Sequence, residues 1–237
     1  MKKYIIIFSI FLIIILSVLI SIYAVAGKKP AYIIQGIKVH DQKTFQQFAD
    51  TIPRVIAKYG GEVLVYGNSS RNYIIEGDPK LSLVVIKFKN IEAAQRCYDS
   101  PEHQAVIGYR KKSSTGWMVI AEQALPFVRK ADMSKSLPGY IIQGIKIHDQ
   151  ETFDEFAKRV PKVIMKYKGS MLVHGKFSKF IKLEGDPGNA LVIIRYKSVD
   201  QAQRCYDSLE HQAIVGYRKV SSTGWMIVAE QFMPKKK

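Results

Sequence analysis

The hydrophobic positions of the chain follow two spacings, which predict strands and amphipathic helices in turn. Residues 32–39 are rich in Ile and Val, as is typical of a strand, whereas residues 41–59 place apolar side chains three or four positions apart, as is typical of a helix. Asp41 is predicted to cap this helix and Gly60-Gly61 to end it. Pro53 falls inside the helical pattern, so a kink or break is expected there.

The pattern then continues through a second set of elements. Strands are predicted at residues 62–66, 81–88 and 115–123, with a short extended segment at 73–76 and a turn at 77–79. A helix is predicted over 91–98, restarting after Ser100-Pro101. The resulting order is β-α-β-β-α-β, a ferredoxin-like plan.

The whole set of elements occurs twice. A shift of 108 residues aligns Tyr32–Gln123 with Tyr140–Gln231 without an insertion, and 56 of the 92 aligned pairs are identical. Two repeats of this length are too few and too long for a solenoid, so they indicate two copies of one compact domain. We therefore divide the chain into a leader (1–27), two repeats (32–123 and 140–231), a linker (124–139) and a basic tail (232–237).

Several strands carry apolar residues at successive positions, as in Leu83–Ile86 and Trp117–Ile120. Such strands are expected to be covered on both faces of their sheet. Two helices per repeat can cover only one face, so the other face needs a partner sheet. We predict an α+β fold: two ferredoxin-like repeats packed sheet to sheet as a pseudo-dimeric α/β barrel, preceded by one hydrophobic N-terminal helix.

The N-terminal stretch Tyr4–Ala26 contains 23 residues and no charge. As a helix it would span about 34 Å, enough to cross a hydrocarbon core of about 30 Å. Ala24-Val25-Ala26 also fits a signal-peptidase site, although the run is longer than a usual signal peptide core. Two outcomes stay open: a membrane anchor through residues 4–26 with the body exported, or secretion after cleavage at Ala26.

The net charge of +16 suggests nucleic acid at first sight, but its distribution argues against that partner. More than half of the excess lies in the tails and the linker, and neither repeat shows a basic stripe interleaved with aromatic residues. The chain has only two cysteines, Cys97 and Cys205, at matching positions of the repeats. We expect both to be buried, inert thiols rather than part of a disulfide scaffold.

An ordered set of motifs resembles a known family. The opening strand at Tyr32, "FQQFADTIPRVIAKYGGEVLVYG", "EGDP" before "LVVIKF", and "AAQRCYDSPEHQ" leading to Arg110 and Thr115-Gly116 look like a tandem copy of the domain-of-unknown-function 1330 family, in the dimeric α/β-barrel superfamily. His103 and His211 depart from it, since members commonly carry Tyr there. The resemblance implies no agreed reaction; superfamily relatives include cofactor-free oxygenases, haem-degrading enzymes and isomerases, so it implies only that the fold can hold small ligands.

The stretches "HQAVIGYRKKSSTGW" and "HQAIVGYRKVSSTGW" carry the candidate chemistry. His103 and His211 could act as acid, base or haem ligand. Arg110 and Arg218 could bind a carboxylate, and an aromatic wall for an apolar ligand could come from the four remaining candidates, Tyr109, Trp117, Tyr217 and Trp225. The structural alternative is that His103 bonds locally, Arg110 pairs with Glu102 and Trp117 fills the core.

Other motifs are weaker. "EGDP" could supply a carboxylate pair, Glu76 and Asp78, but it is also ordinary turn chemistry. The five histidines show no metal-ligand spacing, and no phosphate loop is present, so no metal or nucleotide is expected.

Three classes of function remain open: a module that binds a small, partly apolar ligand between sheet and helices; an oxygenase- or isomerase-type enzyme; and a structural or interaction protein. The sequence does not decide whether the protein is an enzyme, names no cofactor and does not set oligomerisation beyond the pseudo-dimer. Because the repeats differ at Lys112 and Val220, and at Tyr66 and His174, one copy could be active and the other a scaffold.

Overall fold

The computed structural model describes residues 29–67, 72–124, 136–188 and 190–234. The first repeat consists of β1 (Ala31–Val39), α2 (Gln42–Lys58), β2 (Glu62–Tyr66), β3 (Tyr73–Glu76), β4 (Ser82–Phe88), α3 (Ile91–Asp99), α4 (Pro101–Ser113) and β5 (Ser114–Glu122). The second consists of β6 (Gly139–Ile147), α5 (Gln150–Lys166), β7 (Ser170–His174), β8 (Phe180–Glu184), β9 (Ala190–Tyr196), α6 (Val199–Asp207), α7 (Leu209–Ser221) and β10 (Ser222–Glu230). The predicted order of elements is confirmed in both repeats.

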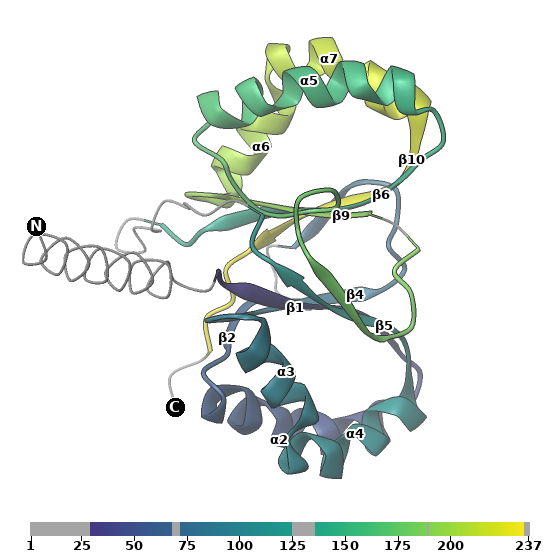
Figure 1. Ribbon diagram of the computed structural model, residues 1–237, viewed down its shortest axis with the longest axis vertical. Helices are drawn as coiled ribbons and strands as arrows, with labels where there is room; N and C mark the ends of the chain where they lie inside the picture. The colour runs from purple at the N-terminus through teal and green to yellow at the C-terminus, as the bar shows by residue number, and fades with distance from the viewer. Residues whose placement is uncertain (1–28, 68–71, 125–135, 189, 235–237) are drawn as a thin grey trace, which may run out of the picture.

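The strands form two five-stranded antiparallel sheets that lie face to face in the middle of the molecule (Figure 1). Helices α2, α3 and α4 cover the outer face of one sheet and α5, α6 and α7 that of the other, giving four layers (Figure 1). The predicted sheet-to-sheet packing is therefore confirmed, and the architecture is that of a pseudo-dimeric α/β barrel.

The two repeats exchange one strand each. The sheet orders are β2-β4-β1-β5-β8 and β3-β10-β6-β9-β7, so β3 of the first repeat pairs with β10 and β8 of the second pairs with β5. A lone repeat would keep only four strands in its sheet. The exchange was not predicted, and it moves residues near Glu76 and Glu184 onto the opposite half of the molecule.

The core between the sheets is apolar and contributed by both repeats. Tyr32, Ile34, Tyr140 and Ile142 are among its most deeply buried side chains. The Tyr32 hydroxyl donates to Oε1 of Gln123 at 2.9 Å, and Tyr140 donates to Gln231 in the same way. Each large polar group that enters this core is thus hydrogen-bonded at its end, as the burial of a hydroxyl requires.

The two ends of α2 follow the sequence prediction, whereas its interior differs from it. Asp41 caps α2 by accepting from the backbone N–H of Thr44, as predicted, and Gly60 takes a positive φ of 73° just beyond the helix. The expected break at Pro53 is wrong, because α2 continues from Gln42 to Lys58. Pro53 is exposed, so water can bind the carbonyl group whose partner is lost, while Val55 and Ile56 keep the helix packed on the sheet.

Both cysteines are free and buried, on opposite sides of the molecule. Cys97 lies in the core beneath α3 and Cys205 in the core beneath α6, with both sheets between them. Burial raises the pKa of Cys97 to about 11 and also raises that of Cys205.

Within the described residues no helix is long and apolar enough to cross a membrane. The predicted N-terminal helix and membrane span, Tyr4–Ala26, lie outside the described residues.

Candidate functional site

The segment around His103 is built by a helix break at Ser100. Ser100 caps α4 by accepting from the backbone N–H of His103 at 3.2 Å, and its own hydroxyl donates to the Cys97 carbonyl at 2.8 Å. His103 is 4% exposed, and its Nδ1 lies 2.6 Å from the Tyr98 carbonyl oxygen. Because a carbonyl only accepts, Nδ1 carries the proton and Nε2 holds the lone pair of the neutral ring.

The surroundings of His103 favour its neutral form. Burial lowers its pKa, outweighing the hydrogen bond to Tyr98, and the nearby Arg110 lowers it further. The ring packs against Phe48 and Tyr98, with centroids 6.1 and 5.0 Å away. His211 has the same arrangement: its Nδ1 meets the Tyr206 carbonyl at 2.8 Å and burial lowers its pKa. A neutral imidazole suits a base or an acceptor rather than an acid.

Arg110 pairs with a residue of the other repeat. The alternative that it pairs with Glu102 is wrong, because Glu102 pairs with Lys58 and accepts from Tyr59 on the surface. One terminal nitrogen of Arg110 instead lies 2.5 Å from both carboxylate oxygens of Glu184. Glu184 reaches Arg110 because β8 has crossed to the sheet of the first repeat.

A tyrosine completes this cluster, and the second half of the molecule repeats it. Tyr98 donates to Glu184 at 2.7 Å. Burial alone would raise the pKa of Glu184, but hydrogen bonds from Arg110 and Tyr98 outweigh it, so the pKa is lowered. The repeated cluster consists of Arg218, Glu76 and Tyr206, where Arg218 lies 2.6 Å from both carboxylate oxygens. Each cluster joins the two repeats through a charge-assisted contact.

Two hydrogen-bond donors near the first cluster lack an acceptor among the described residues. Nε of Arg110 and Nε2 of Gln35 are buried and have no hydrogen-bond partner among the described residues. Gln35, Met118 and Glu184 face one another across β1, β5 and β8. Because Ile33 faces the helices and side chains alternate along a strand, Gln35 also points to the helix side. The layer between sheet and helices therefore contains the polar groups of Gln35 and Glu184, with Met118 between them. Nε of Arg218 is unpaired in the same way.

The predicted aromatic wall does not form beside Arg110. Trp117 lies on the opposite face of the sheet, in the core between the two sheets, and Trp225 packs against the same core. Tyr109 is 41% exposed on α4. Tyr217 is 39% exposed, and its ring lies 5.0 Å from the guanidinium carbon of Arg159. Of the sequence candidates, the structure brings together His103 with Arg110 and His211 with Arg218.

Sequence reasoning missed Glu184 and Gln35, and it considered Glu76 only as part of a carboxylate pair with Asp78. The turn interpretation of "EGDP" is right for Asp78, whose carboxylate accepts from Lys80 N–H at 2.7 Å, and Gly77 has a φ of 56°. The turn interpretation does not account for Glu76, which precedes the turn and pairs with Arg218. An available signal was the recurrence of Glu76 as Glu184 directly after a stretch, residues 71–75 and 179–183, in which every position differs between the repeats.

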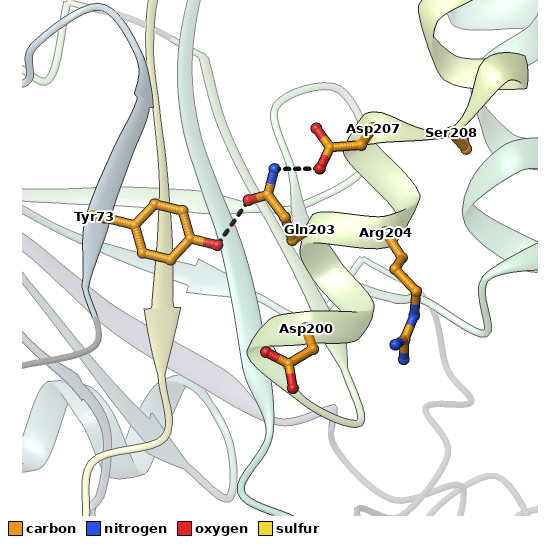
Figure 2. A pocket seen from close by; sticks show the side chains of 6 residues that line it. All are labelled: Tyr73, Asp200, Gln203, Arg204, Asp207 and Ser208. Atoms are coloured by element: carbon orange, nitrogen blue, oxygen red, sulfur yellow. Dashed lines mark hydrogen bonds between the residues drawn. The ribbon is translucent and has the colours of Figure 1, made fainter.

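Two surface grooves lie away from these clusters. The one shown in Figure 2 has a volume of about 500 Å³ and lies beside α6, where Tyr73 of the exchanged strand donates to Gln203 at 2.7 Å and Gln203 donates to Asp207 at 2.8 Å. The other lies over the start of α2. His103 and His211 line neither groove. The described part of the chain contains no group of three or more potential metal ligands.

The fold and the paired clusters define a class of protein: a tandem α/β barrel in which each half contributes a carboxylate to an arginine of the other. The chain belongs to the domain of unknown function family DUF1330, which matches residues 30–124 and again residues 138–232. The tandem copy expected from the motifs is thereby confirmed.

Solved structures of similar fold are distant. A mutant chlorite dismutase from Candidatus Nitrospira defluvii is 9% identical and covers 86% of this chain and 92% of its own, with a TM-score of 0.48. A provisionally named monooxygenase from Lactobacillus acidophilus NCFM is 9% identical and covers 88% of this chain and 100% of its own, with a TM-score of 0.47. A protein of unknown function from Rhodopseudomonas palustris is 14% identical and covers 41% of this chain and 85% of its own, with a TM-score of 0.35. No curated protein matches the chain.

Proposed function

We propose that the protein is a binding module for a small molecule bearing a carbonyl or carboxylate oxygen, held between sheet and helices beside Arg110. The observation that carries the proposal is the pair of buried donors, Nε of Arg110 and Nε2 of Gln35, that lack an acceptor among the described residues. A buried donor without an acceptor costs about 1–3 kcal/mol, so native proteins rarely keep one without a use.

The neighbouring groups set the chemical class of this ligand. Phe48, Met118 and the ring of Tyr98 supply apolar surface on the same side of the sheet. Glu184 already neutralises one side of Arg110, so a neutral or singly charged ligand suits the site better than a multiply charged one. A short ketone, amide or monocarboxylic acid with a hydrocarbon part fits these groups.

A ligand screen on the full chain tests the proposal, with Gln35→Leu as the main variant. Small carboxylic acids, ketones, amides and haem are tested for saturable binding by calorimetry and by shifts in Tm. If Gln35 donates to the ligand, Gln35→Leu weakens binding about tenfold, the loss expected for one hydrogen bond of about 1.4 kcal/mol. The unliganded variant keeps or gains stability, because it no longer buries an unpaired amide.

The matched control is Gln46→Leu on the surface of α2, which should leave both binding and stability unchanged. Destabilisation by Gln35→Leu with no ligand found would contradict the proposal. It would mean that Gln35 holds the fold together, and the structural class of function would then be the better description.

An enzymatic role needs a reactant to reach Nε2 of His103. The neutral ring with its lone pair on Nε2 favours a base, and His103 lies one helical turn before Ile107 and two before Arg110. Since His103 is 4% exposed between Phe48 and Tyr98, a substrate or haem would have to displace side chains that pack around it. His103→Ala tests this role: loss of turnover on a ligand whose binding is retained would support it.

We further propose that the folded body is exported and held at the membrane through residues 4–26. The support is the length and apolarity of that stretch. Alkaline extraction of membranes, with mass spectrometry of the mature N-terminus, tests it. A chain that resists extraction and keeps residues 1–26 supports the anchor, whereas an N-terminus at Gly27 would show secretion instead.

A further inference from the structure

The described ends of both repeats meet at one end of the barrel, which we name the entry face. β1 begins beside the end of β5, with Ala31 opposite Glu122, and β6 begins beside the end of β10, with Gly139 opposite Glu230. The N–H of Gln123 donates to the Pro30 carbonyl at 2.8 Å.

The loop between β7 and β8 belongs to this face. The Lys179 carbonyl accepts from the N–H of Glu122 at 2.8 Å, which places the loop beside the end of β5, across that strand from the start of β1. Phe177 is 60% exposed there, between the exposed Lys176 and Lys179. The first repeat has no aromatic residue at the matching position, which is Ser69.

This exposed phenylalanine is held in place. The ring of His174 stacks on Phe177 at a centroid distance of 4.6 Å and an angle of 23°. The N–H of Phe177 and that of Ser178 both donate to the His174 carbonyl, at 3.0 and 2.9 Å. The ring of Phe177 is thus a large apolar side chain fixed in an exposed position rather than folded back onto the core.

The exposed groups of the entry face also include a further lysine and a methionine. Lys197, whose carbonyl accepts from Ser136, is exposed, and Met233 is 53% exposed after the end of β10. In the sequence Pro234 and then three further lysines, 235–237, follow Met233. Acids also lie at this face, among them Glu62, Glu122, Glu230 and the exposed Asp200, which follows the Ser198-Val199 contact with Gly139. Glu62 and Glu122 have lysines 3.7 and 4.0 Å away, namely Lys87 and Lys29.

The short connection to the N-terminal stretch limits where this face can lie. Only residues 27–30 separate Ala26 from Ala31, and four extended residues reach at most about 14 Å. If residues 4–26 span the bilayer, the entry face lies within that distance of the lipid headgroups. Lysines of this face that come within the Debye length of about 8 Å of anionic headgroups are screened little.

We propose that the entry face docks on an anionic lipid surface, with Phe177 inserted among the headgroups and Lys176, Lys179 and Lys197 facing their charges. Aromatic rings beside lysines are the side chains that the membrane interface favours. This inference rests on the membrane anchoring proposed above, and it adds an orientation: the strand ends face the bilayer and both helix layers stand away from it.

Fluorescence quenching by brominated lipids tests this orientation in the full chain reconstituted into phosphatidylcholine vesicles with and without phosphatidylglycerol. Phe177→Trp adds a reporter at the entry face, and Leu209→Trp adds one at an 86% exposed position on α7. Trp117 and Trp225 provide a constant background, which is measured in the unsubstituted chain. We expect most of the added emission of Phe177→Trp to be quenched in anionic vesicles and that of Leu209→Trp to be unaffected.

Reversal of the charge at two lysines gives a second test of the docking proposal. Lys176→Glu and Lys179→Glu, added to Phe177→Trp, should abolish the quenching without a change in Tm, because both lysines are exposed. Equal quenching at positions 177 and 209, or none at 177, would overturn the docking.

Alkaline extraction of the same vesicles separates the two proposals. Retention without quenching contradicts the docking alone. A released chain contradicts the anchor, and it is then added to fresh anionic vesicles. If these vesicles quench the added emission of Phe177→Trp, the docking proposal is supported. If they do not, the docking proposal is rejected.

Discussion

The most consequential side chains of this protein are two buried arginines whose carboxylate partners come from the opposite repeat. Arg110 and Glu184 are separated by 74 residues and Arg218 and Glu76 by 142, yet each pair is within hydrogen-bond distance. A buried ion pair contributes little net stability when compared with apolar side chains, but removal of one partner leaves an uncompensated charge. Each repeat therefore depends on the other for the neutrality of its interior.

Glu184→Gln should lower the free energy of unfolding by about 3 kcal/mol, since Arg110 would then be buried without a counter-charge. The amide still accepts a hydrogen bond, so the effect belongs at the low end of the range for broken buried pairs. Urea unfolding followed by circular dichroism measures it.

Two further variants make the Glu184→Gln result specific. Glu102→Gln, which disrupts the exposed pair with Lys58, should cost no more than about 1 kcal/mol. The double variant Arg110→Met with Glu184→Met should recover most of the loss. An equal effect of Glu102→Gln and Glu184→Gln would refute the importance of the buried cluster.

Stability should fall as the pH drops from 7 to 4, for two reasons that act in the same direction. The folded pKa of His103 and His211 is below the ordinary value of 6.5, so the unfolded chain takes up protons first as the pH falls through that value. The pKa of Glu76 and Glu184 is below the ordinary 4.5, so the stability they contribute above that pH is lost on further acidification.

Denaturation with urea at several pH values measures this slope. His103→Asn should reduce it between about pH 6.5 and 5, while leaving the part that His211 contributes and the loss near pH 4 intact. An unchanged slope in His103→Asn would show that His103 is not one of the titrating groups.

The sequence alone predicts only some of the side chains of the candidate site. His103 and Arg110 stand out in the repeated segment, and their spacing on one helix brings them to the same side. Glu184 and Gln35 do not stand out, because a glutamate before a turn and a glutamine within a strand are ordinary. Only their partners in space give them a role.

Among the strands, close contact between glycine and tryptophan controls the sheet-to-sheet packing. A Cβ atom on Gly36 would lie 2.6 Å from Cε2 of Trp117, and Gly144 stands in the same relation to Trp225. The glycine lets the indole ring lie flat over β1, which fills the core between the sheets.

Gly36→Ala should therefore destabilise the protein by about 1–3 kcal/mol through overpacking. Gly108→Ala is the matched control: a Cβ there meets nothing within 4 Å, and a helical glycine replaced by alanine gains about 0.5–1 kcal/mol. Thermal unfolding of the two variants should move Tm in opposite directions, and a fall in Tm for both would argue against the steric explanation.

The helices and strands themselves were largely predictable, because their signals are local. The cap at Asp41 and the break between α3 and α4 at Ser100 follow from side chains that bond within a few residues. The break at Pro53 was wrong, since burial of neighbouring side chains on the sheet outweighs the loss of one helical hydrogen bond.

We expect the two repeats to unfold as one cooperative body, because each contributes a strand to the sheet of the other. β3 and β8 complete the sheet of the opposite repeat, and the core between the sheets draws on both. A single repeat would leave this apolar face exposed and its fifth strand unpaired.

Residues 29–124 expressed alone should therefore form a homodimer, in which Glu76 of each copy pairs with Arg110 of the other. Light scattering coupled to gel filtration should give twice the mass of the fragment. Glu76→Lys in this fragment places like charges side by side and should weaken the dimer. A folded monomer would show that exchange is not required.

The linear pattern of the chain was enough to establish the tandem β-α-β-β-α-β repeats, the burial of both faces of each sheet and the position of His103 and Arg110 on one helix. These features depend on periodicity and on contacts between near neighbours, which the order of residues records directly. The strand exchange, the Arg110–Glu184 and Arg218–Glu76 pairs and the placement of Trp117 away from Arg110 emerged only in three dimensions. The physical reason is that the hydrogen-bonding edge of a strand is nearly the same for any sequence. Which edge β3 or β8 joins is decided by the packing of the whole barrel.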